Sequence, residues 1–237
     1  MTEELKVQVI KDEEGTSYES SLSFKIIVIG DPFVGKSSLT MRATRGTFEN
    51  AYNSTVGFEF CSFYVKIAET IVKLQIWDTC GQEIYRSLIS SFYHNSSLAI
   101  IVYSIDNEMS FHNIETWLNE IKTLGNPDVN IFLIGNKADL KDKRKVTKEM
   151  ADTFCDNNNI DFFLETSAKT GFNADIVFIE AAKLLYNQHL KLNGKVVSKP
   201  YSLNNLFDKD AIENHFKLSN EEKEEEDIRP RKRRCCK

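Results

Sequence analysis

The stretch Gly30-Asp31-Pro32-Phe33-Val34-Gly35-Lys36-Ser37 decides the fold of this chain. It matches G-x-x-x-x-G-K-[ST], in which glycines let backbone N–H groups approach phosphate oxygens. The apolar run 24–29 before it predicts a buried strand, and residues 37–43 after it can form a helix. Because this is the strand–loop–helix context that phosphate binding requires, an ordinary glycine turn is the weaker interpretation. The pattern predicts that Lys36 reaches the terminal phosphates and that Ser37 binds Mg²⁺.

Size and composition indicate one α/β domain with tails. The chain has 237 residues, of which 41% are hydrophobic, and its net charge of −5 gives no signature of nucleic-acid binding. The longest apolar runs have the length of strands, and residues 1–20 lack the apolar centre of a secretory signal, so we expect a cytosolic protein. The five cysteines have no metal-type spacing, and we expect no disulfide framework.

Strands alternate with helices along the chain, and two apolar runs around a short connector predict an antiparallel hairpin. The expected strands are 24–29, 57–67, 71–77, 98–105, 129–134 and 162–164, and the expected helices are 37–43, 111–124, 147–157 and 173–190. This order predicts an α/β fold with a mostly parallel six-stranded sheet, one antiparallel hairpin strand and helices on both faces. The expected regions are a flexible extension over 1–21, one domain over 22–190 and a flexible tail over 191–237.

Polar motifs follow several of these strands, and ligands of parallel sheets bind at the carboxyl ends of the strands. Asp78 ends the second hairpin strand and is the acidic group expected near Mg²⁺, with water between them. Gln82 follows four residues later, where a glutamine can orient an attacking water. Aspartates at strand ends and exposed amides are common, so only the combination with Lys36 and Ser37 supports a catalytic interpretation.

The sequence Asn136-Lys137-Ala138-Asp139 follows another expected strand and matches N-K-x-D. The Asp139 carboxylate can accept hydrogen bonds from both the ring N–H and the exocyclic amine of guanine. Adenine would leave that carboxylate unpaired, which is costly in a buried site, so the motif selects the base strongly. Four residues alone are a weak signal, but downstream of a phosphate loop they are a strong one.

Taken together, these residues resemble the Ras superfamily of small GTPases, and within it the Rab branch, over roughly residues 23–190. The guanine-nucleotide motifs appear in order as the phosphate loop, Thr55, Asp78-Thr79-Cys80-Gly81-Gln82, Asn136-Lys137-Ala138-Asp139 and Ser167-Ala168-Lys169. The Rab character rests on Thr55-Val56-Gly57-Phe58-Glu59-Phe60, Lys73-Leu74-Gln75-Ile76-Trp77, Tyr85-Arg86-Ser87-Leu88 and the paired terminal cysteines.

The resemblance implies roles for named residues. The implied nucleotide-binding residues are Phe33, Val34, Gly35, Lys36, Ser37, Ser38, Phe48, Thr55, Gly81, Asn136, Lys137, Asp139, Ser167, Ala168 and Lys169. Ser37, Thr55 and Asp78 would hold the metal, Lys36 and Gln82 would act in catalysis, and Phe60, Trp77 and Phe92 would form the apolar triad that effectors contact. Core packing is the alternative interpretation of that triad, above all for Trp77.

Within this set, some roles are specific. The family implies that Thr55 and Gly81 contact the γ-phosphate and that its loss releases their loops, an order–disorder switch. Phe48 would pack on the base, Ala168 would present its N–H to the guanine carbonyl, and the stems of Lys137 and Lys169 would flank the ring.

The chain departs from the family pattern at a few positions. Pro32 replaces a small residue, has no N–H and borders the space for the γ-phosphate and an incoming arginine finger, so it bears on the hydrolysis rate. Cys80 replaces a small alanine, and little change is expected there. The segment 92–96 and Ile84 also differ from the usual pattern, which bears on the choice of effector.

At the C-terminus, an acidic run over 221–227 meets a basic run over 229–234 before Cys235-Cys236-Lys237. This ending is not a C-a-a-X box, because one residue follows the second cysteine. Paired terminal cysteines resemble the Rab site of double geranylgeranylation, and two lipid chains give the stable anchoring that one chain does not. Two exposed thiols are the alternative interpretation.

The leading functional hypothesis is a monomeric GTP-hydrolysing switch in membrane trafficking. It uses Mg²⁺, takes GTP to GDP and cycles between cytoplasm and the cytoplasmic face of an intracellular membrane. The implied partners are an exchange factor, a GTPase-activating protein, effectors, a GDP-dissociation inhibitor or escort protein, and a prenyltransferase, with no nucleic acid. A nucleotide-loaded binding module with little hydrolysis is an alternative that Pro32 supports. A kinase sharing the phosphate loop is another, against which the guanine motif argues.

Overall fold

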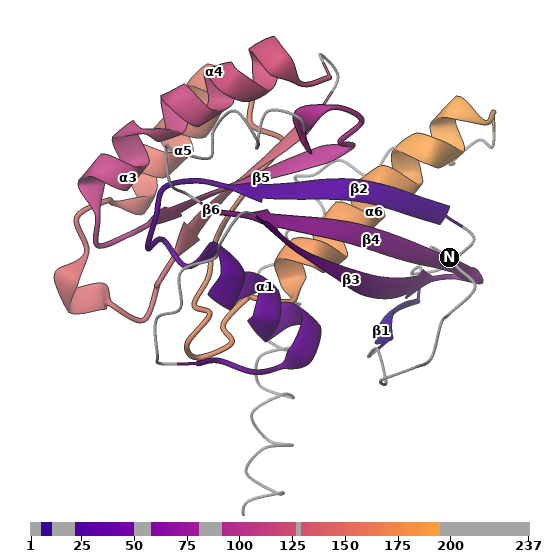
Figure 1. Ribbon diagram of the computed structural model, residues 1–237, viewed down its shortest axis with the longest axis horizontal. Helices are drawn as coiled ribbons and strands as arrows, with labels where there is room; N and C mark the ends of the chain where they lie inside the picture. The colour runs from indigo at the N-terminus through magenta and orange to yellow at the C-terminus, as the bar shows by residue number, and fades with distance from the viewer. Residues whose placement is uncertain (1–5, 11–21, 50–57, 81–91, 127–128, 195–237) are drawn as a thin grey trace, which may run out of the picture. The chain divides into compact units, whose positions relative to one another are not determined.

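The computed structural model describes residues 6–10, 22–49, 58–80, 92–126 and 129–194 (Figure 1). Within them, the strands are β1 (Val7–Ile10), β2 (Leu22–Ile29), β3 (Phe58–Ile67), β4 (Thr70–Thr79), β5 (Leu98–Ser104), β6 (Asn130–Asn136) and β7 (Phe162–Glu165). The helices are α1 (Lys36–Arg45), α3 (Glu108–His112), α4 (Ile114–Leu124), α5 (Lys148–Asn158) and α6 (Ile176–Leu192), with a short 3₁₀ helix at Lys141–Lys143. Among these residues, no helix is both long enough and apolar enough to cross a membrane.

The seven strands form one sheet in the order β1-β3-β4-β2-β5-β6-β7. The pairs β2–β4, β2–β5, β5–β6 and β6–β7 are parallel, and β3 and β4 form the antiparallel hairpin. The prediction of a mostly parallel α/β sheet with one hairpin is therefore confirmed. Because the parallel strands share one direction, the ends of β2, β5, β6 and β7 present their following loops at one edge of the sheet.

Strand β1 corrects the predicted sheet, which had six strands. It pairs antiparallel with β3, from Val7 opposite Ile67 to Ile10 opposite Tyr64, and so adds a strand at the edge. The prediction assigned these residues to a flexible extension. Three of the four residues of β1 are β-branched, and the edge of β3 offers unpaired backbone groups, so the pairing buries apolar side chains and satisfies both strands.

Helices cover both faces of the sheet, as predicted (Figure 1). On one face, Trp117, Leu118 and Ile121 of α4 pack with Ile27 and residues of β5 and β6 in a single apolar cluster. On the other face, α6 lies across β3 and β4, and the rings of Phe63 and Phe178 are 5.5 Å apart. The central strands are apolar on both sides because both sides are buried.

The predicted helix over 111–124 is two helices in the structure. Helix α3 ends at His112 and α4 begins at Ile114, with Asn113 between them. Asn107 caps α3, since its side chain accepts a hydrogen bond from the Ser110 N–H at 3.4 Å. The break has a consequence for the site, because it places the Asn113 side chain beside the phosphate loop. The next helix, α5, is capped by Thr147, whose side chain accepts a hydrogen bond from the Met150 N–H at 3.2 Å.

Candidate functional site

The loop between β2 and α1 has the backbone shape that its sequence predicts. Gly30 has φ 135°, and a Cβ there would lie 2.2 Å from the Val102 carbonyl oxygen, so only glycine fits. Gly35 has φ 92° and caps α1, which places the helix N-terminus at the end of the loop. Phe33 is unusual, because it holds φ 65° as an aromatic residue and its side chain is 64% exposed. The loop therefore presents backbone amides and a helix dipole to one space.

Lys36 reaches back across this loop from the first turn of α1. Its Nζ donates hydrogen bonds to the carbonyl oxygens of Gly30 at 2.9 Å and Asp31 at 2.8 Å. Burial lowers the pKa of Lys36 to about 8, although Asp78 and Asp31 oppose the shift. The ammonium group therefore remains mostly charged at neutral pH, inside the loop where a phosphate would lie.

Asp78 lies at the end of β4, opposite Val28 of β2, and is 1% exposed. Burial raises its pKa to about 7, with Ser37 and Lys36 as partial offsets. Both carboxylate oxygens are buried without a well-aligned hydrogen-bond partner among the described residues, and a small cavity lined by Ser37, Glu59 and Asp78 adjoins them. An unsatisfied buried carboxylate beside a hydroxyl is a donor set that suits Mg²⁺, since this ion takes oxygen ligands and retains waters. The residues present fit the ion that the motif predicts.

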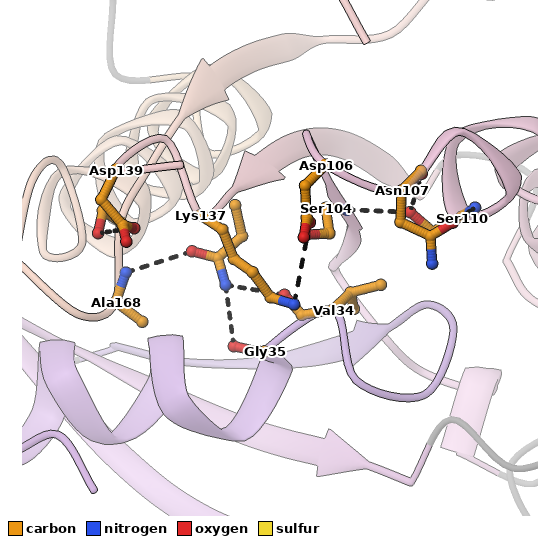
Figure 2. Close-up of polar contacts among 11 residues, drawn as sticks. Val34, Gly35, Ser104, Asp106, Asn107, Ser110, Lys137, Asp139 and Ala168 are labelled. Atoms are coloured by element: carbon orange, nitrogen blue, oxygen red, sulfur yellow. Dashed lines mark hydrogen bonds and ion pairs between the residues drawn. The ribbon is translucent and has the colours of Figure 1, made fainter. Parts of the chain in front are cut away.

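Asn136, at the end of β6, joins the phosphate loop to the segment after β7. Its Nδ2 donates to the carbonyl oxygens of Val34 at 2.9 Å and Gly35 at 3.3 Å. Its Oδ1 accepts from the Thr166 hydroxyl and from the Ala168 N–H, both at 3.2 Å. Figure 2 shows Val34 and Gly35 of the phosphate loop facing Ala168 of the segment after β7. One buried amide thus determines the spacing between two binding loops.

Asp139 and Lys137 flank this junction in the same loop (Figure 2). The Ser167 hydroxyl donates to Asp139 Oδ1 at 2.6 Å and accepts from the Thr170 N–H at 3.1 Å, so the carboxylate is held by the facing loop. Lys137 has φ 64°, and its Nζ lies 4.0 Å from Asp106 Oδ1. The two halves of the guanine motif, residues 136–139 and 167–169, come together here because they follow β6 and β7, which are adjacent parallel strands.

Comparison with known proteins decides the family. The model of the Ras family matches residues 25–187. The chain belongs to the Ras family.

Its relatives place it in the Rab branch. It is 44% identical over 166 residues to the Ras-related protein Rab5 of Nicotiana tabacum, covering 70% of this chain and 82% of that protein. It is 43% identical over 170 residues to the Ras-related protein RHN1 of Nicotiana plumbaginifolia, and 41% identical over 170 residues to the Ras-related protein RABF2a of Arabidopsis thaliana. Each of these two alignments covers 72% of this chain and 84% of the relative. This Rab-family chain is therefore a small GTPase, a switch of vesicle trafficking, and the inert binding module is not favoured.

The structure brings most of the predicted nucleotide residues to one edge of this Rab-family domain. The phosphate-loop group comprises Phe33, Val34, Gly35, Lys36, Ser37 and Ser38, and the base-site group comprises Asn136, Lys137, Asp139, Ser167, Ala168 and Lys169. Phe48 is half-buried and lies under the Arg42 guanidinium. Thr55, Gly81, Gln82, Cys235 and Cys236 fall outside the described residues, so their roles stay predictions.

The three residues of the predicted effector triad lie together in an aromatic patch at the surface, and the patch contains a fourth residue that was not predicted. The Trp77 ring lies 5.4 Å from that of Phe60 and 5.1 Å from that of Phe92. Phe58 joins them, because its ring lies 5.3 Å from that of Trp77 and 4.6 Å from that of Phe92. Phe58 and Phe60 are two residues apart on β3 and therefore lie on the same face of the strand. Phe58 is 42% exposed and Phe60 is 49% exposed, so this part of the patch is not simple core packing. The period-2 spacing of Phe58 and Phe60 is the signal that could have identified the additional member.

Asp31 is a residue of the loop whose contacts the motif did not predict. Its carboxylate accepts hydrogen bonds from Asn113 Nδ2 at 2.7 Å and Trp117 Nε1 at 2.9 Å. Asn113 and Trp117 are one helical turn apart, so they face the loop together. These contacts attach the segment before Pro32 to α4. No local pattern could have revealed them, because the partners are 82 and 86 residues away in the chain.

Proposed function

We propose that this site binds GTP and GDP together with Mg²⁺ and that the chain hydrolyses GTP through the residues assembled here. The observation that carries the proposal is the Asn136 side chain, which bonds the phosphate loop through Val34 and the base-site loop through Ala168. A phosphate cradle and a guanine-selective carboxylate held at a set spacing match one ligand class, a guanine nucleotide.

At the phosphate end, the loop amides and Lys36 would bind the β- and γ-phosphates. The buried, positively charged ammonium group of Lys36 would partly neutralise the negative charge of the phosphates. Ser37 and Thr55 would ligate Mg²⁺ directly, and Asp78 would hold it through water. When bound, the ion neutralises charge that develops between the phosphates. Gln82 would orient the water that attacks the γ-phosphate in line, and a GTPase-activating protein would complete the site in trans. Pro32 would border the γ-phosphate and so would influence the hydrolysis rate.

At the base end, Asp139 would accept hydrogen bonds from the guanine ring N–H and exocyclic amine. Ser167 orients that carboxylate through its 2.6 Å hydrogen bond. The Ala168 N–H, which donates a hydrogen bond to Asn136 Oδ1, would also donate one to the guanine carbonyl oxygen. Phe48 and the stems of Lys137 and Lys169 would pack against the faces of the ring.

The switch would act through Thr55 and Gly81, which would contact the γ-phosphate and lose that contact on hydrolysis. The partners of the cycle would be an exchange factor, a GTPase-activating protein and effectors that contact Phe60, Trp77 and Phe92. Prenylation of Cys235 and Cys236 by a prenyltransferase, with an escort protein or GDP-dissociation inhibitor, would anchor the monomer to the cytoplasmic face of an intracellular membrane. The proposed regions are an N-terminal segment over 1–21, of which Val7–Ile10 form β1, one domain over 22–190 and a C-terminal tail over 191–237.

The direct test is nucleotide binding by the purified full chain. Fluorescent mant-GDP and mant-GTP should bind with Mg²⁺, unlabelled GDP and GTP should displace them, and ATP should not. Single-turnover hydrolysis of bound GTP then tests the reaction. Displacement of mant-GDP by ATP as effectively as by GDP would contradict the proposed base selectivity.

The metal role of Ser37 leads to a prediction. Ser37→Asn should weaken GTP more than GDP, because GTP shares the ion across two phosphates and loses more when a ligand is removed. We expect the affinity for GTP to fall by on the order of tenfold more than that for GDP, or about 1.4 kcal/mol. Titrations of both nucleotides with Mg²⁺ measure this, and repeating them in EDTA is the control, since the difference should then disappear. Equal losses for the two nucleotides with Mg²⁺ present would count against the assignment.

The water-orienting role of Gln82 leads to another prediction. Gln82→Leu keeps the size of the side chain and removes its hydrogen-bonding groups. Single-turnover hydrolysis should slow by on the order of tenfold or more, a barrier increase of at least about 1.4 kcal/mol. Affinity for GTP, measured in parallel, should hardly change, which separates chemistry from binding. A variant that hydrolyses GTP at the wild-type rate would remove Gln82 from the mechanism.

A further inference from the structure

Arg42 lies in the last turn of α1, outside every nucleotide-binding motif, yet all three of its guanidinium nitrogens bond backbone carbonyls. Nε donates to the Ala168 carbonyl at 2.8 Å, and Nη2 donates to the Lys169 carbonyl, also at 2.8 Å. Nη1 donates to the Gly46 carbonyl at 2.7 Å. The guanidinium is planar and its donors are fixed in direction, so these three contacts define the position of each segment relative to the others.

The same guanidinium also contacts Phe48. Its Cζ lies 5.9 Å from the centre of the Phe48 ring, within the range of a cation–π contact. The segment that carries Gly46 and Phe48 follows α1, and the segment that carries Ala168 and Lys169 follows β7. Arg42 therefore joins the ring proposed to stack on the base to the loop proposed to bind the base edge.

The peptide groups of Ala168 are held from two sides. Its N–H donates to Asn136 Oδ1 at 3.2 Å, and its carbonyl accepts from Arg42 Nε at 2.8 Å. Asn136 also holds the phosphate loop, as described above, whereas Arg42 holds Phe48. Removing Arg42 would leave Ala168 with only its hydrogen bond to Asn136. It would also remove the contacts through which Ala168 is linked to the Phe48 segment.

Helix α1 connects this base-end contact to the phosphate end of the site. Lys36 begins the helix and Arg42 is six residues further on, which at the helical rise per residue is about 9 Å along the axis. The helix thus keeps a fixed separation between a side chain that would bind phosphate and a side chain that positions the base-binding segments.

We infer that Arg42 is a positioning residue for nucleotide retention: it holds the Phe48 segment and the Ala168–Lys169 segment together around the base and so slows release of guanine nucleotide. The inference rests on the proposed binding of guanine nucleotide at this site. Arg42 is not among the residues proposed to bind the phosphates or the metal, and its effect would be exerted through Phe48, Ala168 and Lys169.

The test compares three variants of the full chain. Arg42→Ala removes all the contacts, Arg42→Lys keeps the charge but cannot span three carbonyls, and Arg45→Ala is the matched control. Arg45 is in the same turn of the same helix and is exposed. Each protein is loaded with mant-GDP and chased with excess GDP, once with Mg²⁺ and once with EDTA. Hydrogen exchange of the peptide spanning 166–172 and the melting temperature are measured on the same samples.

We expect Arg42→Ala to release mant-GDP about tenfold faster than wild type, as the loss of a charged hydrogen-bond donor predicts. The ratio should be the same with and without Mg²⁺, because the effect arises at the base end. Arg42→Lys should release nearly as fast as Arg42→Ala, and exchange over 166–172 should rise in both. Arg45→Ala should stay within about twofold of wild type, as for an ordinary surface substitution.

Release at the wild-type rate from either Arg42 variant would overturn the inference. So would an acceleration that vanishes in EDTA, since that would place the effect at the metal. A lowered melting temperature with unchanged exchange over 166–172 and unchanged release would assign Arg42 to stability alone. If Arg42→Ala does not fold, Arg42→Lys decides the outcome. A wild-type protein that binds no mant-GDP would instead contradict the proposed function, so the two failures are distinguishable.

Discussion

Asp139→Asn should abolish the preference of this protein for guanine nucleotides and create one for xanthine nucleotides. Guanine presents two donors to Asp139, its ring N–H and its exocyclic amine, and each hydrogen bond to a charged group contributes about 1.5–3 kcal/mol. An asparagine amide would face the exocyclic amine with its own N–H groups. We therefore expect the affinity for GDP to fall by on the order of 100-fold or more.

Xanthine supplies the complementary pattern, because it carries a carbonyl oxygen where guanine carries the amine. The asparagine Nδ2 can donate to that oxygen while Oδ1 accepts from the ring N–H. The neighbouring Ser167 hydroxyl donates to Asp139 Oδ1 at 2.6 Å. A hydroxyl can donate or accept, so the substitution leaves no buried polar group without a partner, and the loop should keep its shape.

The measurement is competition of GDP, XDP and ADP against a fluorescent nucleotide, for the wild type and the variant. Asp142→Asn is the matched control, since Asp142 lies three residues further on in the exposed 3₁₀ helix and should leave the preference unchanged. A variant that still prefers GDP over XDP would remove Asp139 from base recognition. Such a result would also remove the main argument against a nucleotide kinase.

Replacing both terminal cysteines by serine should move the protein from membranes to the soluble fraction in cells. One lipid chain gives marginal and reversible binding, whereas two give stable anchoring. The basic run 229–234 would add about 1 kcal/mol for each residue near an anionic surface, too little to retain the protein without lipid. We expect the membrane-bound fraction of the Cys235→Ser, Cys236→Ser variant to fall by on the order of tenfold or more.

Intact mass spectrometry of the cellular protein should show two prenyl groups on the wild type and none on the double variant. Each single variant should carry one group and bind membranes weakly. Cys155→Ser is the control, because Cys155 lies in α5 and is partly buried, so fractionation should be unchanged. Unmodified terminal cysteines in the wild type, or a double variant that stays on membranes, would contradict the lipid anchor.

Local sequence was sufficient for the parts of the site that depend on consecutive residues. Gly30 and Gly35 have the backbone angles that the phosphate loop requires, and Lys36 and Ser37 follow at the start of α1. Likewise, Asn136 ends the buried strand β6 and Asp139 follows in the next loop, as the spacing predicted. Such motifs are readable because turn chemistry and capping act between neighbours in the chain.

Sequence was less informative where an element depends on a distant partner. Residues 7–10 looked like part of a polar extension, because four residues cannot form a stable strand alone, and only the edge of β3 makes them one. The break between α3 and α4 was missed for a related reason. The apolar residues on both sides of the junction keep helical spacing, so the sequence predicts one helix. The hydrogen bond from the Asn113 side chain to Asp31 is made to a residue 82 positions away, which local spacing cannot show.

By itself, then, the sequence determined the nucleotide class, the family, and the order of strands and helices apart from β1 and the break between α3 and α4, because each of these depends on motifs and periodicity within short windows. Only the tertiary structure decided which side chains hold those motifs in place. Asp31 bonds Trp117, Asn136 bonds Val34, and Arg42 bonds Ala168 across separations of 86, 102 and 126 residues. Hydrogen bonds of this kind depend on distances of about 3 Å between atoms, and the folding of parallel strands side by side is what creates such distances between remote parts of a chain.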